Sequence, residues 1–238
     1  MKPALTRRAM CPPLHWSELP MGEWIAAEIQ ERLNAWCPEL FGYHLLKLGA
    51  LSSELSCCCS TIRHQSALAP EGQQIGLRGE LEDLPIRDGA IDACLLAHAL
   101  DYSADPHQLL REVDRVLTVD GWVLISGFNP HSLVGIGRWW PSLRRRQPWH
   151  ARMFAPERIR DWLELLGFEM VHCELFGFSS FSSNSRIHWW RENLGRDYVP
   201  YLASVYVLAA RKRTIPLTPE LKQRWQRKPI IVPGMARV

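Results

Sequence analysis

The sequence predicts an α/β protein in which helices cover both faces of a mostly parallel sheet. Residues 91–100 and 122–128 are apolar at nearly every position, without the polar alternation of a strand that faces water. Such strands belong to a parallel sheet, where both faces are covered. A helix-like segment and the turn residues Asp120 and Gly121 separate the two runs, which gives the order strand, helix, turn, strand.

Length and composition fit one domain with elaborations. With 238 residues the chain can bury a full α/β core. No apolar run reaches the roughly 20 residues that span a bilayer, and no apolar core follows the two arginines near the N-terminus. We therefore expect a cytoplasmic protein without a transmembrane segment.

The seven cysteines indicate neither a disulfide framework nor a metal site. Their number is odd, and three of them are adjacent at residues 57–59. Adjacent side chains diverge and no second pair of ligands stands nearby, so we expect no bound metal. The favoured interpretation of the triplet is a set of small side chains at a strand edge.

The net charge of +3 hides an uneven distribution of charged residues. Residues 1–130 carry 10 Lys and Arg against 17 Asp and Glu, whereas residues 131–238 carry 18 against 8. A basic half that is also rich in Trp indicates an anionic partner, although a solvated basic surface is an equally good interpretation. Among anionic partners, we expect a small-molecule substrate in preference to nucleic acid.

The chain divides into a helical N-terminal segment, residues 1–40, and a domain over residues 41–213. Apolar residues at helical spacing within 14–38 predict a helix that packs on the sheet, with Ser17 and Glu18 as candidate cap residues. The strands of the domain are predicted, in chain order, at residues 43–48, 61–68, 73–78, 91–100, 122–128, 168–178 and 202–211. We expect the last two to be antiparallel neighbours at one edge of the sheet.

Three helices are predicted within the domain, at residues 51–55, 106–117 and 156–166. The first is short, and the other two are amphipathic. Gly167 ends the last helix at the C′ position. The remaining segments of the domain are inserts at about residues 131–155 and 179–201, and residues 214–238 form a basic tail whose prolines and charge indicate mobility.

Residues 79–128 resemble a known family. The segment GELEDLPIRDGAID is similar to the acidic loop and fourth strand of class I S-adenosylmethionine-dependent methyltransferases of the small-molecule type, with a type 11-like methyltransferase domain. The segment LLREVDRVLTVDGWVLIS resembles the next helix, turn and fifth strand of that family. The resemblance implies a Rossmann-like sheet of seven mostly parallel strands, with S-adenosylmethionine bound at their carboxyl ends.

The resemblance also implies which residues contact the cofactor. Gly49 and Ala50 follow the first strand, where the family has a glycine-rich loop that approaches the methionine part of the cofactor. Glu80 corresponds to the acidic residue that accepts a hydrogen bond from the adenine amino group, and Leu81 to the residue that packs on the adenine ring. Ala97 ends the fourth strand beside the expected methyl donor. Without the resemblance, a glycine after a strand and an acidic loop are ordinary surface features.

The glycine-rich loop departs from the family pattern. Ala50, Leu51 and Ser52 stand where further glycines and small residues are expected, and Lys47 stands near the place of an acidic residue. The segment from Gly49 to residue 79 is also short, because roughly 30 residues cannot supply two strands and two full helices. We expect a central first strand and a truncated helix or bare loop over one face.

The acidic residue that binds the ribose hydroxyls in this family is not evident. Glu71 is the nearest candidate, but the sequence Pro70-Glu71-Gly72 is typical of a hairpin tip. Losing the two charge-assisted hydrogen bonds of a ribose carboxylate would cost about 1.5–3 kcal/mol of binding free energy. The sequence therefore predicts weak binding of S-adenosylmethionine.

Candidate substrate contacts follow the fourth and fifth strands. His98 is a candidate to orient the substrate or accept a proton, although a histidine at a strand end is often only a satisfied surface residue. Asp101 and Tyr102 lie in the same loop. Asn129 and His131 belong to a segment that resembles a substrate-facing loop, and Asn-Pro is equally a turn signal. The Trp residues of the inserts have two interpretations: they cover an aromatic substrate, or they form a small hydrophobic core, which is the default.

These features predict S-adenosylmethionine-dependent methyl transfer to a small molecule. Such transfer depends mainly on alignment and desolvation, so a missing catalytic triad does not argue against it. Two alternatives remain open at this point. One is an inactive binding or scaffold protein on the same fold. The other is an RNA-associated protein that uses the basic half, which contains no recognised RNA-binding module.

Overall fold

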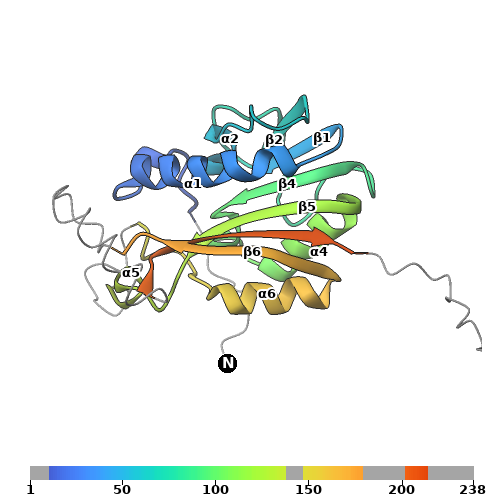
Figure 1. Ribbon diagram of the computed structural model, residues 1–238. Coiled ribbons are helices and arrows are strands. Elements are labelled where there is room, and N and C mark those ends of the chain that lie inside the picture. The colour runs from blue at the N-terminus through green and yellow to red at the C-terminus, as the bar shows by residue number, and fades with distance from the viewer. Residues whose placement is uncertain (1–10, 138–146, 179–201, 214–238) are drawn as a thin grey trace, which may run out of the picture.

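Seven strands form a single sheet in the middle of the protein (Figure 1). The computed structural model describes residues 11–137, 147–178 and 202–213. The strands are β1 (His44–Leu48), β2 (His64–Ala69), β3 (Leu77–Arg78), β4 (Ile91–Ala97), β5 (Leu117–Phe128), β6 (Phe168–Phe176) and β7 (Val205–Lys212). Their order across the sheet is β3-β2-β1-β4-β5-β7-β6.

The strand directions confirm the predicted mostly parallel sheet. The neighbours from β3 to β5 run parallel to one another, and β7 runs antiparallel between β5 and β6. The antiparallel pair at one edge agrees with the sequence prediction. The strand order reverses between β1 and β4, because β2 and β3 extend the sheet to one side and β5 to β7 extend it to the other.

Helices cover both faces of this sheet, as predicted (Figure 1). The helix α1 (Gly22–Trp36) lies on one face, and α4 (Pro106–Val116) and α6 (Pro156–Leu165) lie on the other. Neighbouring residues of β1 show the alternation, since Leu45 packs in the core beside α1 and Leu46 in the core beside α4 and α6. The protein therefore has two apolar cores separated by the sheet.

Local sequence signals define the helices over the second core. Asp105 caps α4, because its Oδ1 accepts hydrogen bonds of 3.1 Å from the backbone N–H groups of His107 and Gln108. Proline stands in the first turn of both α4 and α6, where its missing N–H is harmless. Gly167 follows α6 with a φ of 87°, as expected for a residue that ends a helix.

The N-terminal helix differs from the prediction. Residues 16–18 form a separate 3-10 helix, η1 (Trp16–Glu18), and α1 begins only at Gly22. The residue that precedes α1 is Met21 in the left-handed conformation, so the candidate caps Ser17 and Glu18 were wrong. Leu19 between the two helices is buried and has an extended backbone, with φ of −90° and ψ of 141°, which ends η1. A short η2 (Cys37–Glu39) follows α1.

The shortened segment after β1 agrees with the prediction. A five-residue helix, α2 (Ala50–Glu54), is the one helix between residues 49 and 79, all of which the structure describes. β2 begins at His64 rather than at residue 61, and β3 has only two residues.

The cysteines at 57–59 lie in a turn between α2 and β2 and not at a strand edge. No group of three or more potential metal ligands gathers within the described residues.

Two further boundaries were wrong. β4 ends at Ala97, and residues 99–102 form the helix α3 (Ala99–Tyr102) instead of a strand that reaches residue 100. β5 begins at Leu117 and includes the turn at Asp120 and Gly121, followed after Phe128 by α5 (Leu133–Gly137).

In the described ranges, no helix combines the length and apolarity needed to cross a bilayer. The predicted insert at 179–201, the tail at 214–238 and the Arg triplet at 144–146 lie outside the described residues.

Candidate functional site

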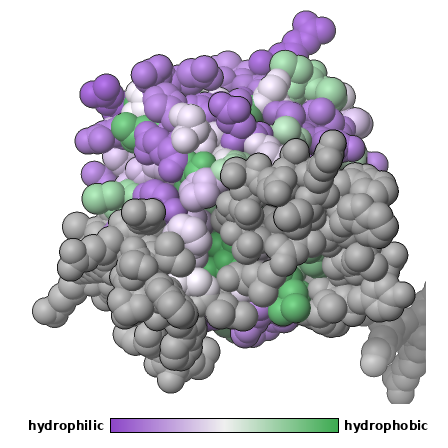
Figure 2. Space-filling model, turned by 90° about the vertical axis from the view of Figure 1, so that its left-hand side faces the viewer, coloured by the Kyte–Doolittle hydropathy of each residue, from purple (hydrophilic) through white to green (hydrophobic). Residues whose placement is uncertain are grey.

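A cavity of about 630 Å³ lies at the carboxyl ends of β1, β2 and β4. Its lining comes from residues 11–14 and 18, 49–51, 69–71, 80–82, 97–99 and 102–104. Ligands of open α/β sheets bind at this place, beside the reversal of strand order. Figure 2 views the molecule from the side toward which β4 points in Figure 1, where the described surface is largely hydrophilic with a few small apolar patches.

The turn after β1 approaches this cavity through Gly49. Its φ of 92° and ψ of 156° are accessible essentially only to glycine. A Cβ on Gly49 would meet only Ala99 Cβ, at 3.5 Å, so the backbone here borders open space. Ala50 and Leu51 also line the cavity. The structure therefore brings together the predicted Gly49 and Ala50 with an accessible stretch of backbone.

The residues that replace further glycines hold this turn in place. Ser52 is fully buried, and its Oγ donates to Leu48 O at 2.6 Å and accepts from Ala97 N at 2.7 Å. Ser52 thus ties the end of β1 to the end of β4. Lys47 does not line the cavity, because its Nζ donates to Leu55 O at 2.7 Å beyond α2.

The acidic residue after β2 was misinterpreted from the sequence. β2 and β3 are parallel, so Pro70, Glu71 and Gly72 begin a crossover and do not form a hairpin tip. A Cβ on Gly72 would lie 3.4 Å from Ala50 Cβ, which places this segment against the turn after β1. Glu71 is exposed and lines the cavity. The sequence signal was present, since an acidic residue stands two positions beyond a strand.

The acidic loop before β4 forms another wall of the cavity. Glu80, Leu81 and Glu82 all line it. Glu82 is fixed, because its Oε1 accepts a 2.6 Å hydrogen bond from Ser103 Oγ. Glu80 is exposed, and Leu81 packs partly against the core beside α4. The structure thus places the two residues predicted to contact adenine at the same cavity as Gly49.

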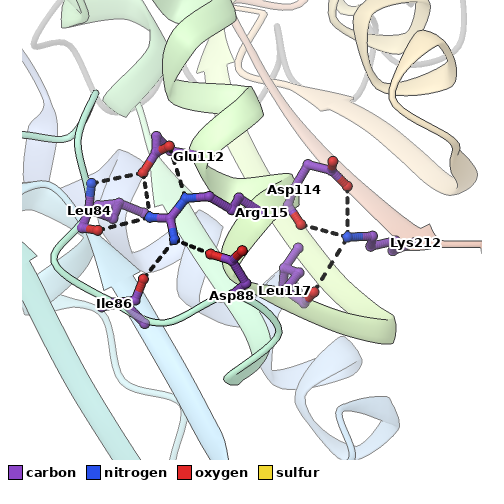
Figure 3. A network of polar contacts seen from close by, with 8 residues as sticks. All are labelled: Leu84, Ile86, Asp88, Glu112, Asp114, Arg115, Leu117 and Lys212. Atoms are coloured by element: carbon purple, nitrogen blue, oxygen red, sulfur yellow. Dashed lines mark hydrogen bonds and ion pairs between the residues drawn. The ribbon is translucent and has the colours of Figure 1, made fainter.

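Two residues of α4 hold the following segment, residues 84–88, in position (Figure 3). Glu112 Oε2 accepts from Leu84 N at 2.9 Å, and Arg115 donates to Leu84 O at 2.9 Å and to Ile86 O at 2.8 Å. The hydrogen bond from Arg115, together with that from Leu84 N, lowers the pKa of Glu112 although burial opposes it. Glu112 is buried although it carries a charge, and these hydrogen bonds satisfy its carboxylate.

His98 lines the cavity immediately after β4 and has an unusual backbone. Its φ of 53° lies in the left-handed region, which turns the chain from β4 into α3. Nδ1 of His98 lies 3.0 Å from Oδ2 of Asp101, and both side chains have 0% exposure. The imidazole packs against Phe128 with 4.0 Å between ring centroids and a tilt of 31°, and it makes an edge-on contact with Trp16 at 5.6 Å. This packing fixes the ring in one orientation.

Tyr102 connects the loop after β4 to the N-terminal segment that covers the cavity. Its hydroxyl donates to Gln147 Oε1 at 2.8 Å, and Gln147 Nε2 donates to Cys11 O at 3.0 Å. Burial, followed by the nearby charges of Asp101 and Glu18, raises the pKa of Tyr102 well above its ordinary value. Tyr102 therefore remains a protonated hydrogen-bond donor at neutral pH.

Comparison with known proteins matches this architecture. A sequence profile described as a methyltransferase domain matches residues 47–125. The uncharacterized protein YafS of Escherichia coli (strain K12) is 38% identical over 234 residues, which cover 97% of this chain and 94% of that protein. A SAM-dependent methyltransferase from Archaeoglobus fulgidus has a TM-score of 0.58 at 18% identity, covering 79% of this chain and 94% of the other. The chain belongs to the same family as YafS, and it contains a methyltransferase domain with the class I methyltransferase fold.

A second solved structure shows the same fold. The putative S-adenosylmethionine-dependent methyltransferase from Listeria monocytogenes has a TM-score of 0.57 at 13% identity, covering 80% of this chain and 99% of that one. The matching methyltransferase domain and these two structures confirm the resemblance of residues 79–128 and the fold that it implied.

The structure does not bring every predicted site residue of this methyltransferase domain to the cavity. Asp101 lies behind His98 and has no place in the lining. Asn129 is buried, its Nδ2 donates to Ala203 O at 2.9 Å, and its Oδ1 accepts from His131 N at 3.0 Å. These bonds make a turn that leads into α5. His131 is exposed and, like Asn129, is not among the lining residues.

The described aromatic residues of the insert after β5 belong to the two cores of the methyltransferase fold. Trp149 packs against the core beside α1 and donates to Val134 O at 2.9 Å. Phe154 is buried against Trp162 of α6, with ring centroids 5.2 Å apart. Trp139, Trp140, Trp189 and Trp190 lie outside the residues that the structure describes.

Proposed function

We propose that this protein binds S-adenosylmethionine in the cavity at the strand ends and transfers its methyl group to a small molecule. The observation that carries the proposal is the convergence of Gly49, Glu71, Glu80 and Ala97 on one cavity. These residues come from four separate segments of the chain. Their positions are those that the family resemblance assigns to the methionine, ribose, adenine and sulfonium parts of the cofactor.

Each residue suits the part of the cofactor that it would contact. Gly49 lets the methionine part approach the backbone, because no side chain stands there. The carboxylate of Glu71 would accept from the ribose hydroxyls, and that of Glu80 from the adenine amino group. Leu81 supplies an apolar contact for the adenine ring. Ala97 is small enough to leave space beside the sulfonium, which supplies the methyl group together with a good leaving group.

The remaining work of the protein is to align the acceptor and exclude water. The N-terminal residues 11–14 lie over the cavity and are linked through Gln147 to Tyr102. His98 is the candidate to contact the acceptor, and Asp101 is a positioning residue that holds its ring. Holding two reactants in an attack geometry provides much of the rate enhancement of group transfer.

Calorimetric titration with S-adenosylmethionine tests the proposal. We expect one weak binding site in the wild-type protein, because only one glycine of the usual loop is present. Glu71→Gln and Glu80→Gln should each lose about 1–3 kcal/mol of binding free energy, as expected when a charge-assisted hydrogen bond is removed. Glu164→Gln, on the exposed face of α6, is the matched control and should bind like the wild type.

Two results would contradict the proposal. Absence of binding at millimolar cofactor would favour the alternative of an inactive binding or scaffold protein. Binding that neither Glu71→Gln nor Glu80→Gln weakens would mean that the cofactor lies elsewhere.

A further inference from the structure

Nε2 of His98 is a buried polar atom for which the described part of the protein provides no hydrogen-bond partner. Its side chain has 0% exposure, and buried polar atoms of native proteins are nearly always paired. Asp101 engages the other ring nitrogen and does not line the cavity, whereas His98 does. Because His98 lines the cavity and Asp101 does not, a ligand in the cavity is the candidate partner for this unpaired nitrogen.

The hydrogen bonds of Asp101 determine what kind of ligand this is. Oδ2 of Asp101 accepts from Phe128 N at 2.9 Å as well as lying 3.0 Å from Nδ1 of His98. An ionised carboxylate only accepts hydrogen bonds, so in the contact between Oδ2 of an ionised Asp101 and Nδ1 of His98 the proton belongs to Nδ1. In the neutral imidazole Nε2 then has only a lone pair. The group that pairs with Nε2 must be an N–H or O–H donor.

The charges around the cavity also favour a hydrogen-bond donor without an anionic group. Its lining includes the four carboxylates of Glu18, Glu71, Glu80 and Glu82, and no lysine or arginine among the described lining residues. The sulfonium and amino groups of S-adenosylmethionine suit such a lining. An acceptor that carries a carboxylate or a phosphate would instead be repelled by these four carboxylates.

We propose that the methyl acceptor is an amine or a hydroxyl compound without an anionic group, and that it donates a hydrogen bond to Nε2 of His98. This inference rests on the proposed function and specifies its substrate class. It replaces the anionic substrate that the basic half of the sequence suggested, because the Asp, Glu, Lys and Arg residues of the described lining are all glutamates.

The proton balance of the reaction follows from this arrangement. A hydroxyl loses its O–H bond as its oxygen lone pair forms the new bond to the methyl carbon, and the proton passes to Nε2. An ammonium gives one proton to Nε2 first, and the freed nitrogen lone pair then attacks. In both cases the carbon–sulfur bond breaks and leaves an uncharged thioether. His98 is thus the catalytic residue, and Asp101 stabilises the resulting imidazolium as a positioning residue.

Three small aromatic probes of similar shape test the substrate class: benzylamine, benzyl alcohol and benzoate. The full-length protein is first saturated with S-adenosylhomocysteine, which prevents turnover, and each probe is then titrated by calorimetry. Benzylamine and benzyl alcohol should bind, and benzoate should bind roughly tenfold more weakly or not at all, because it meets the carboxylates without a cation to pair with. Glu18→Gln should weaken benzylamine while leaving benzyl alcohol unchanged.

His98→Asn tests the role of Nε2. Asparagine tolerates the left-handed backbone at this position, and its amide can still donate to Asp101. Binding of benzylamine and benzyl alcohol should fall in His98→Asn and stay unchanged in the control His172→Asn, which lies on β6 outside the cavity. The ¹⁵N resonance of Nε2 in wild-type protein should also shift when benzylamine is added, which a purely structural histidine would not show.

The outcomes separate the inference from the proposed function. If S-adenosylhomocysteine binds but benzoate matches benzyl alcohol, or if none of the three probes binds, the substrate class is wrong and the cofactor site stands. An unshifted Nε2 resonance at saturating benzylamine rejects the role of His98, even if His98→Asn fails to fold. If S-adenosylhomocysteine itself does not bind, the proposed function fails, whatever the probes do.

Discussion

Nη2 of Arg115 lies 2.7 Å from Oε2 of Glu112, one turn away on α4. Both residues form hydrogen bonds with the backbone that follows the acidic loop (Figure 3). The guanidinium also reaches Asp88, at 2.5 Å. A helix on one side of the sheet thereby fixes the segment between Glu80 and β4. The position of one cavity wall depends on this pair.

Removing the guanidinium should destabilise the protein. Arg115→Gln leaves Glu112 buried without its charged partner and frees the carbonyls of Leu84 and Ile86. We expect a loss of about 1–3 kcal/mol in the free energy of unfolding, measured by urea denaturation. Arg111→Gln is the matched control, because Arg111 is exposed on the same helix and bonds only Gln108 in the described contacts. Equal stability of the two variants would refute the structural role of the pair.

Acid should weaken the same interaction. Because Arg115 lowers the pKa of Glu112 from its ordinary value of 4.5, the stabilisation is fully present above about pH 4.5. It is lost as the pH falls through the lower pKa of the folded state. Unfolding free energies measured from pH 6 downward should therefore fall more steeply in the wild type than in Glu112→Gln. Parallel curves would contradict this assignment.

The backbone at Gly49 predicts a large cost for a small substitution. Gly49→Ala introduces a Cβ that has room, so its penalty comes from the φ of 92° rather than from a clash. Such a conformation costs roughly 1–3 kcal/mol for a residue other than glycine. Gly76→Ala is the control, because its φ is not in this region and its nearest neighbour, Ala67 O, is 3.8 Å away. The melting temperature of each variant, compared with that of the wild type, tests this expectation. If Gly49→Ala lowers the melting temperature no more than Gly76→Ala does, the backbone at Gly49 is not strained for alanine.

The tautomer of His98 is a further expectation. With Asp101 ionised, neutral His98 should carry its proton on Nδ1, whereas the opposite tautomer is commoner in free histidine side chains. Long-range ¹H–¹⁵N correlation spectra of the histidine rings report which nitrogen is protonated. A proton on Nε2 would contradict the assigned substrate class, because a protonated Nε2 has no lone pair to accept a hydrogen bond.

Deleting residues 214–238 should leave cofactor affinity unchanged. The described residues that line the cavity all lie between residues 11 and 104, far in sequence from this tail. If the tail instead serves nucleic acid, gel shifts should show binding whose log affinity falls steeply with log salt, because phosphate contacts release counterions. A steep slope at physiological salt that disappears on deletion would move the RNA-associated alternative ahead of the small-molecule function.

The parts of the fold that the sequence predicted well are those with dense apolar patterns. β4 and β5 are buried on both faces and α4 has a clear apolar stripe, so periodicity located all three. The two-residue β3 has no such pattern, since Leu77 and Arg78 are both exposed. Its length was therefore overestimated. The order of the strands across the sheet is contained in no local pattern, and the structure gives it.

The candidate site was predicted where it depends on order along the chain and not where it depends on side-chain direction. Gly49, Glu80 and Ala97 reach the cavity because they end or precede strands. Glu71 was set aside because a turn between strands has the same sequence signals in a hairpin and in a crossover. Asp101 was assigned to the substrate, and the left-handed turn at His98 directs it inward instead.

A structure of the protein crystallised with S-adenosylhomocysteine tests the central claim most directly. We expect the ligand in the cavity at the ends of β1, β2 and β4, with adenine beside Glu80 and Leu81, ribose hydroxyls at Glu71, and the homocysteine part against the backbone of Gly49. An empty cavity at saturating ligand, or a ligand bound elsewhere on the protein, would contradict the account.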